Sequence, residues 1–98
     1  VTTSKIRNLL AMTADIYNDV LAEKEERLPA EIISRINYLK IRFVYEAGRE
    51  PEVKRLMDEA SIMSYLNDIK GSKRQYILFS RYMEALVAYH RYYGGRDN

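Results

Sequence analysis

The chain has 98 residues, of which 47% are hydrophobic and 31% are charged, and its formal net charge is +2. This length suits a single domain, and no apolar run approaches the roughly 18 residues of a membrane span. The absence of Cys excludes disulfides and thiolate metal sites and is natural for a cytoplasmic protein.

Four helices are predicted, in chain order, from apolar residues that recur at helical spacing. The first follows Thr2 and Thr3, either of which can cap it. The second and third begin at Pro29 and Pro51, because Pro favours the first turn of a helix. Ser72 caps the fourth. The predicted helices cover residues 4–23, 29–48, 51–71 and 72–94, and the last three end at or near Gly residues.

This pattern predicts an all-α fold. With only four Gly and two Pro in the chain, few positions interrupt a helix. We expect a compact bundle of four to five helices that forms one domain over residues 1–98. Because residue 1 is Val, we also expect that the natural N-terminal segment is missing.

Charged residues are segregated along the chain. Acidic residues outnumber basic ones in segments 15–31 and 50–69, whereas basic residues outnumber acidic ones in 32–49 and 70–98. On a helix, the ordinary partner of a base is an acid three or four positions away, as Lys54 has. Distinctly positive surfaces are therefore predicted. Bases with no acid at that sequence spacing include Lys5, Arg7, Lys40, Lys73, Arg74 and Arg91.

The starts of the first and last helices carry cations where acids are favoured. Their sequences are TTSKIR and GSKRQ, which place Lys5, Arg7, Lys73 and Arg74 beside hydroxyl groups and free backbone N–H groups. That combination predicts anion binding. The alternative is that these are ordinary surface cations, and the two helix starts together favour an anionic polymer.

The second helix combines arginine with tyrosine. Arg35, Arg42 and Arg49 recur every seven residues, and so do Tyr38 and Tyr45, which places the two residue types in adjacent stripes. Such surfaces bind RNA, because phosphates contact the cations and bases or riboses stack on rings. The alternative is that the tyrosines are packing residues. The acids within helical reach of these arginines are Glu31 for Arg35 and Glu46 for Arg42, and Arg49 can share Glu46.

The last helix, QYILFSRYMEALVAYHRYY, is apolar over most of its circumference. Such a helix is either central in its fold or covered by a partner, and a small bundle has difficulty burying every side. We therefore predict a subunit interface that includes Tyr82, Tyr89, Tyr92 and Tyr93.

No catalytic set is found in the sequence. His90 is the only His and lies on an apolar face, so a packing role is favoured over a catalytic or metal-binding one. There is no Gly-rich phosphate loop and no nucleophile elbow. We expect a protein that is not an enzyme and that uses no cofactor, no metal and no small-molecule substrate.

Three segments resemble a known family. TTSKIRNLL, YLKIRFVYEAGR and YMEALVAYHRYYGGRD, in that order, are similar to blocks of the small helical subunit of the type III-A CRISPR effector, the Csm complex. The resemblance covers residues 2–97. It implies a compact helical bundle that stacks in several copies along the guide RNA–target RNA duplex. It also implies a non-catalytic role beside the backbone and large subunits. The binding positions that it implies are Lys5, Arg7, Lys40, Arg42 and Arg49.

The expected partners are therefore guide RNA, target RNA, the other subunits and further copies of the chain, without a membrane. Lys73, Arg74 and Arg91 are predicted RNA contacts from the charge pattern alone. The main alternative is a helical protein–protein adaptor whose cations meet acids on its partner. A helical DNA-binding domain ranks last, because no recognisable helix-turn-helix joins two of the helices.

Overall fold

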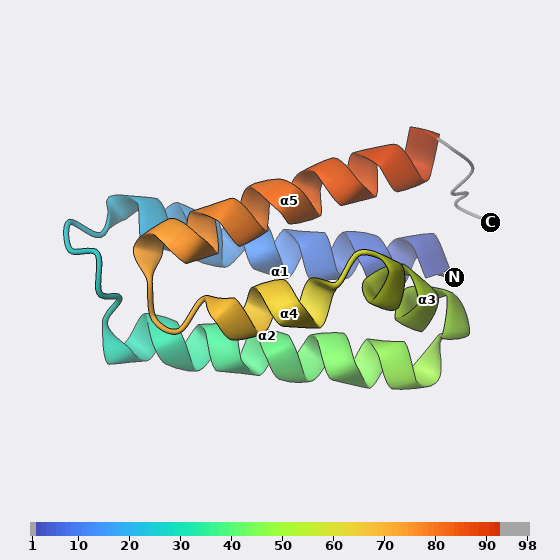
Figure 1. Ribbon diagram of the computed structural model, residues 1–98, viewed down its shortest axis with the longest axis horizontal. Helices are drawn as coiled ribbons and strands as arrows, with labels where there is room; N and C mark the ends of the chain where they lie inside the picture. Colours follow the sequence, from blue (N-terminus) through green and yellow to red (C-terminus); the bar gives the residue numbers. More distant parts are fainter. Residues whose placement is uncertain (1, 93–98) are drawn as a thin grey trace.

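Five helices make up the part of the chain that the computed structural model describes, which is residues 2–92, with side chains described from residue 4 (Figure 1). No strand occurs within that range. The predicted all-α bundle of four to five helices is confirmed. The helices are α1 (Thr2–Ala22), α2 (Ala30–Arg49), α3 (Pro51–Glu59), α4 (Ile62–Asp68) and α5 (Lys73–Tyr92).

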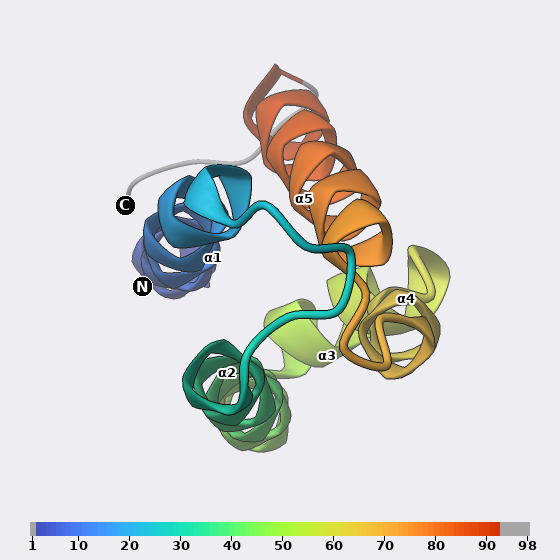
Figure 2. The same cartoon turned by 90° about the vertical axis from the view of Figure 1, so that its left-hand side faces the viewer.

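The core lies between the three long helices and is closed by α3 and α4. Helix α1 packs against both α2 and α5, while α3 and α4 link the end of α2 back to α5 (Figures 1 and 2). The rings of Phe43 and Phe79 meet edge to face at 6.1 Å between centroids. Each long helix therefore buries one stripe, as the apolar spacing predicts.

The predicted third helix, 51–71, is wrong as a single element. Ser61 adopts a left-handed conformation, with φ 56°, and separates α3 from α4. In one continuous helix, Ile62 and Leu66 would lie about 180° around the axis from Val53. All three side chains are buried, so the chain turns at Ser61 to bring both apolar stripes to the core. The reversal of the apolar pattern was the sequence feature that could have revealed this break.

The other helix boundaries agree with the expected ones within a residue or two. Pro29 precedes α2 and Pro51 is the first residue of α3. Ser72 caps α5, because its hydroxyl oxygen accepts a hydrogen bond of 3.1 Å from the backbone N–H of Gln75. The structure does not describe the side chains of the predicted caps, Thr2 and Thr3. The predicted end at Gly94 also lies outside the described residues.

Two connections meet at one end of the bundle. Arg27 and Ser72 form an isolated antiparallel bridge. In it the N–H of Leu28 donates to the carbonyl of Gly71, and the N–H of Lys73 donates to the carbonyl of Glu26, both at 2.8 Å. The connection between α1 and α2 is therefore tied to the connection between α4 and α5 (Figure 1). Among the described residues, no helix is both long enough and apolar enough to span a membrane.

Candidate nucleic-acid interface

The predicted basic residues of α2 lie on opposite flanks of that helix. Positions two apart on a helix do not face each other, and Lys40 lies about 160° around the axis from Arg42. Lys40 lines a pocket together with Leu66 and Ile69, on the side of α4. One phosphate therefore cannot contact Lys40 and Arg42 together.

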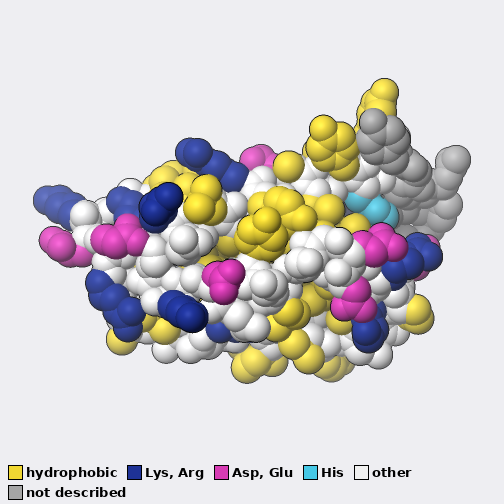
Figure 3. All heavy atoms as spheres, viewed as in Figure 1, with side chains coloured by type: hydrophobic (Ala, Val, Ile, Leu, Met, Phe, Trp, Pro, Cys, Tyr) yellow, Lys and Arg dark blue, Asp and Glu magenta, His cyan; other side chains and the backbone are white. Residues whose placement is uncertain are grey.

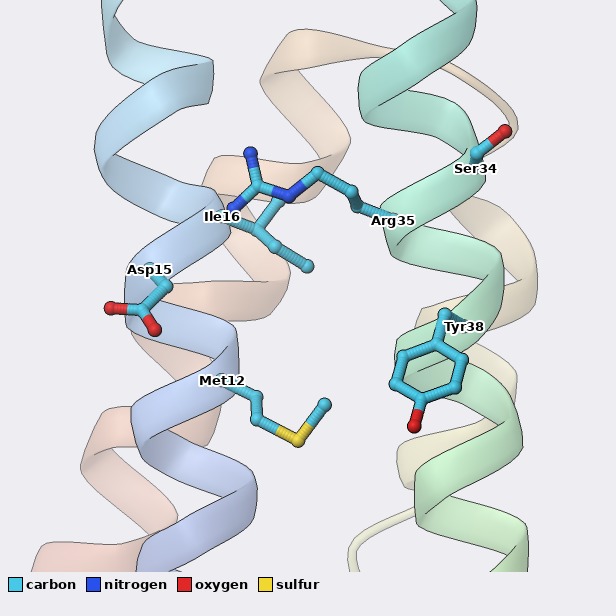
Figure 4. Close-up of a pocket in the computed structure, with 6 residues that line it drawn as sticks. All are labelled: Met12, Asp15, Ile16, Ser34, Arg35 and Tyr38. Atoms are coloured by element: carbon cyan, nitrogen blue, oxygen red, sulfur yellow. The ribbon is translucent and has the colours of Figure 1, made fainter.

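The opposite flank of α2 faces α1. Arg35 and Tyr38 line a cavity of about 290 Å³ with Met12 and Ile16 (Figure 4). The guanidinium of Arg35 forms an ion pair with Asp19 of α1 and not with Glu31, its expected helical neighbour. Both members of this pair are well exposed, so the pair adds little stability.

Further along this flank, two guanidinium groups share one aromatic ring. The guanidinium carbons of Arg42 and Arg49 lie 5.0 and 5.4 Å from the ring centroid of Tyr45. Tyr45 is 49% exposed and Tyr38 is 55% exposed, so about half of each side chain remains accessible to a ligand. Arg42 also forms an ion pair of 2.6 Å with Glu46. The result is an exposed arginine–tyrosine surface.

Lys5 and Arg7 lie on different flanks of α1, as Lys40 and Arg42 do on α2. Lys5 lies within about 20° of Met12 around α1 and two turns before it. Because α1 and α2 run antiparallel, the start of α1, which carries Lys5, lies at the same end of the bundle as the end of α2 (Figure 1). Arg7 lies on the other flank of α1 and has an interaction partner within the chain. By this helical geometry we expect Lys5, and not Arg7, to lie on the flank of α1 that faces the Arg42 side of α2.

The start of α5 already holds an anion from the same chain. The carboxylate of Glu26 accepts hydrogen bonds from the Ser72 hydroxyl and from the backbone N–H of Arg74, the latter at 3.3 Å to the nearer oxygen. The ammonium group of Lys73 donates to the carbonyl of Glu23. A phosphate at this helix start would have to share it with Glu26, so the role of Lys73 and Arg74 in RNA binding stays a prediction.

The predicted interface tyrosines of α5 differ from one another. Tyr82 is half-buried: its hydroxyl donates to the carbonyl of Ala60 at 2.9 Å, and its ring stacks on that of Tyr65 with 4.4 Å between centroids. Tyr89 and Tyr92 are 63% and 79% exposed. Arg91, in the same last turn of the helix, is exposed and has a partner within the chain. Tyr93 lies outside the described residues.

Sequence reasoning missed an uncharged strip on the outside of α2. Its exposed apolar members recur at spacings of three and four, and the strip lies opposite the buried face of the helix. That spacing was visible in the sequence, but only Tyr38 and Tyr45 were singled out, as a stripe beside the arginines. The strip comprises Ser34, Asn37, Tyr38, Ile41, Val44, Tyr45 and Gly48.

Cations also gather at the end of the bundle where the two connections meet (Figure 3). Lys24, Lys73, Arg74 and Arg81 line a groove of about 420 Å³, together with Glu26. Only two of these were predicted contacts, because the sequence does not show that the connections touch. Within residues 2–92, no three His, Asp or Glu side chains are grouped so as to hold a metal ion.

Comparison of the sequence with known proteins identifies a family for this chain. The family model described as Csm2 Type III-A matches residues 1–96. A Streptococcus thermophilus protein named "CRISPR system Cms protein Csm2" is 44% identical over 99% of this chain and 76% of its own length. The Mycobacterium tuberculosis protein of the same name is 36% identical over 99% of this chain and 78% of its own. The Enterococcus italicus protein of the same name is 34% identical over 95% of this chain and 68% of its own length.

Proposed function

The chain belongs to the type III-A Csm2 family, and from this premise we propose that it is a non-catalytic subunit that contacts RNA phosphates in a CRISPR complex. Its relatives carry the name of a CRISPR system protein, and its sequence blocks imply a place beside guide and target RNA. The proposal includes backbone and large subunits as partners, several copies of this chain, and a cytoplasmic location.

The observation that carries the proposal is the pair of guanidinium groups over Tyr45. Arg42 and Arg49 lie on the same side of α2 at 5.0 and 5.4 Å from that ring, and Lys5 belongs to the end of α1 that lies beside the end of α2. Cations supply charge to phosphates, while an exposed ring offers a stacking surface to a ribose or base. Neither contact requires a particular base, which suits a protein that serves changing guide sequences.

One copy should bind weakly. Contacts to phosphates alone give dissociation constants of roughly 10⁻⁴–10⁻⁶ M at physiological salt. Copies held side by side make each further contact intramolecular, and avidity can then exceed single-copy affinity by roughly 10²–10⁴. The exposed Tyr89 and Tyr92 at the end of α5 are the proposed self-association residues, together with Tyr93.

A protein–protein adaptor remains the second candidate, because the outer strip of α2 favours it. Ile41 and Val44 are 61% and 56% exposed within this uncharged strip. An apolar strip at helical spacing suits a partner helix. In that case, the arginines beside it would meet acidic side chains of the partner.

The test is fluorescence anisotropy with a labelled single-stranded RNA and with an RNA duplex over a series of salt concentrations. We expect binding that weakens steeply with salt, and we expect Arg49→Gln to lower the log–log slope by about one unit. Lys54→Gln is the matched control, because Lys54 pairs with Asp58 at 2.8 Å on α3, away from this surface. Equal slopes for Arg49→Gln and the parent would remove Arg49 from the interface. Absence of binding to either RNA would favour the adaptor.

A further inference from the structure

A second basic site lies on the other flank of α2, between that helix, α4 and the connection to α5. It is a pocket of about 380 Å³, within the roughly 300–1,000 Å³ range of small-ligand sites. Three of its lining residues are cations, namely Arg27, Lys40 and Lys70, and no lining residue is acidic. Among the described residues, none of the three cations forms an ion pair.

The three cations come from three separate parts of the chain. Arg27 belongs to the connection between α1 and α2, Lys40 belongs to α2, and Lys70 precedes α5. Helical periodicity therefore does not account for their meeting. Like charges that converge repel one another, most strongly where protein excludes water. An anion bound among them would turn this repulsion into attraction.

Arg27 is held in place at the rim of the pocket. Its backbone forms the bridge to Ser72, and its Nη1 donates a hydrogen bond of 3.1 Å to the carbonyl of Lys70. Gly71 allows this approach, because a Cβ at that position would lie 2.6 Å from Nη1 of Arg27. The guanidinium has five N–H donors and uses one here, so others remain for a ligand.

The remaining walls suit a nucleotide better than a bare ion. The Asn37 amide adds a polar group beside Lys40, and Ile36, Leu66 and Ile69 supply apolar wall. A phosphate can contact the cations while the attached ribose lies against the apolar side chains.

We propose that Arg27, Lys40 and Lys70 bind one phosphate of the RNA, with its ribose against Ile36, Leu66 and Ile69. The assignment rests on the proposed function and adds to it a second phosphate site, on the flank of α2 opposite Arg42 and Arg49. RNA that crosses the outer face of α2 would then be held on both sides of the helix. Neither the family's blocks nor the charge pattern identified Arg27 or Lys70.

The experiment follows backbone amide signals by nuclear magnetic resonance while the ¹⁵N-labelled chain is titrated with adenosine 5′-monophosphate, adenosine, inorganic phosphate or single-stranded RNA. We expect saturable shifts of the Lys70 and Gly71 amides with the monophosphate and with RNA, but not with adenosine. Lys70→Asn should weaken monophosphate binding by about tenfold and lower the salt slope of RNA binding by about one unit. Asn tolerates the left-handed backbone of residue 70, so this variant removes the charge and keeps the fold.

Lys40→Gln serves as a second variant and Lys54→Gln as the control. The proposed phosphate site would be overturned if the monophosphate shifts do not saturate. It would also be overturned if Lys70→Asn binds the monophosphate as tightly as the parent. RNA binding that is lowered by Arg49→Gln but unchanged by Lys70→Asn would overturn it while leaving the proposed function intact. Saturable monophosphate binding without any RNA binding would overturn the RNA assignment and identify a free nucleotide as the ligand.

Discussion

Arg42 donates a hydrogen bond of 2.6 Å to the carboxylate of Glu46, whose side chain is only 4% exposed. The second carboxylate oxygen, Oε1, has no hydrogen-bond partner among the described residues. The ion pair with Arg42 is therefore the main interaction that stabilises the buried Glu46 carboxylate. Arg42 also lies beside the exposed ring of Tyr45. Any reading of Arg42 variants in RNA binding has to separate these two roles.

We predict that Arg42→Met lowers the free energy of unfolding by about 3 kcal/mol, because it leaves the Glu46 carboxylate buried without a partner. Arg49→Met should cost less than about 1 kcal/mol, since Arg49 is exposed and its contact is with the Tyr45 ring. Urea denaturation measures both values. Equal losses would contradict the assigned role of Glu46.

The double variant Arg42→Met, Glu46→Leu should regain most of the stability lost in Arg42→Met, because replacing a whole buried ion pair by apolar groups is often neutral. It also provides a folded protein without the Arg42 charge for RNA binding. A double variant as unstable as Arg42→Met would show that Arg42 supports the fold by packing and not through Glu46.

Gly71→Ala should destabilise the chain by about 1 kcal/mol or more, because Gly71 has φ +75° and an added Cβ would meet Arg27. Gly48→Ala is the matched control. Gly48 is helical with open space around it, so Gly48→Ala should raise the free energy of unfolding by about 0.5–1 kcal/mol. Thermal and urea unfolding of both variants measure the difference. If adding Arg27→Ala to Gly71→Ala restores none of the lost stability, the destabilisation comes from the backbone conformation of residue 71 and not from the contact with Arg27.

Tyr76→Phe should change how stability depends on pH. Burial raises the pKa of Tyr76, with an opposing influence from Arg35, and its hydroxyl donates a hydrogen bond of 2.7 Å to the carbonyl of Thr13. The stability that the neutral phenol confers is complete below the unfolded pKa of about 10 and is lost as the pH rises towards the raised folded pKa.

The parent should therefore lose stability more steeply than Tyr76→Phe above about pH 10. The variant should already be less stable by about 1 kcal/mol near neutral pH, because it lacks the hydrogen bond. Urea unfolding at a neutral and an alkaline pH gives both quantities. Parallel pH profiles would mean that Tyr76 ionises in the folded chain as easily as in the unfolded one.

Tyr89→Asp combined with Tyr92→Asp should lower the number of copies that co-purify with the assembled complex, because both rings are exposed at the proposed self-association surface. Circular dichroism first checks that the variant folds. Ile41→Asp, on the outer strip of α2, is the companion variant and should be incorporated normally. The reverse outcome would place the assembly contact on α2 and favour the adaptor.

The long helices were predictable because each combines a start residue with one apolar stripe. Pro29 and Ser72 marked the starts of α2 and α5, and the buried positions followed helical spacing. The break at Ser61 was not predicted, since no Gly or Pro marks it and the reversal of the apolar pattern was overlooked. The fold was thus predictable wherever local pattern and core packing agree.

The candidate site was less predictable, because sequence spacing identifies neighbours on one helix only. Arg35 was assigned to Glu31, yet it reaches Asp19 on α1. Lys40 had no acid within helical reach, and its neighbours in space, Arg27 and Lys70, come from distant connections. Contacts between elements set these partners, and a single sequence does not encode them as a spacing.

The bridge between Arg27 and Ser72 has a consequence for native-state hydrogen exchange. Connections usually open first, with a small local free energy. Here the amides of Leu28 and Lys73 can exchange only when two connections, far apart in sequence, separate. Opening at this end of the bundle therefore requires the two connections to move together. Equal free energies of opening for these two amides would identify the two connections as one unfolding unit.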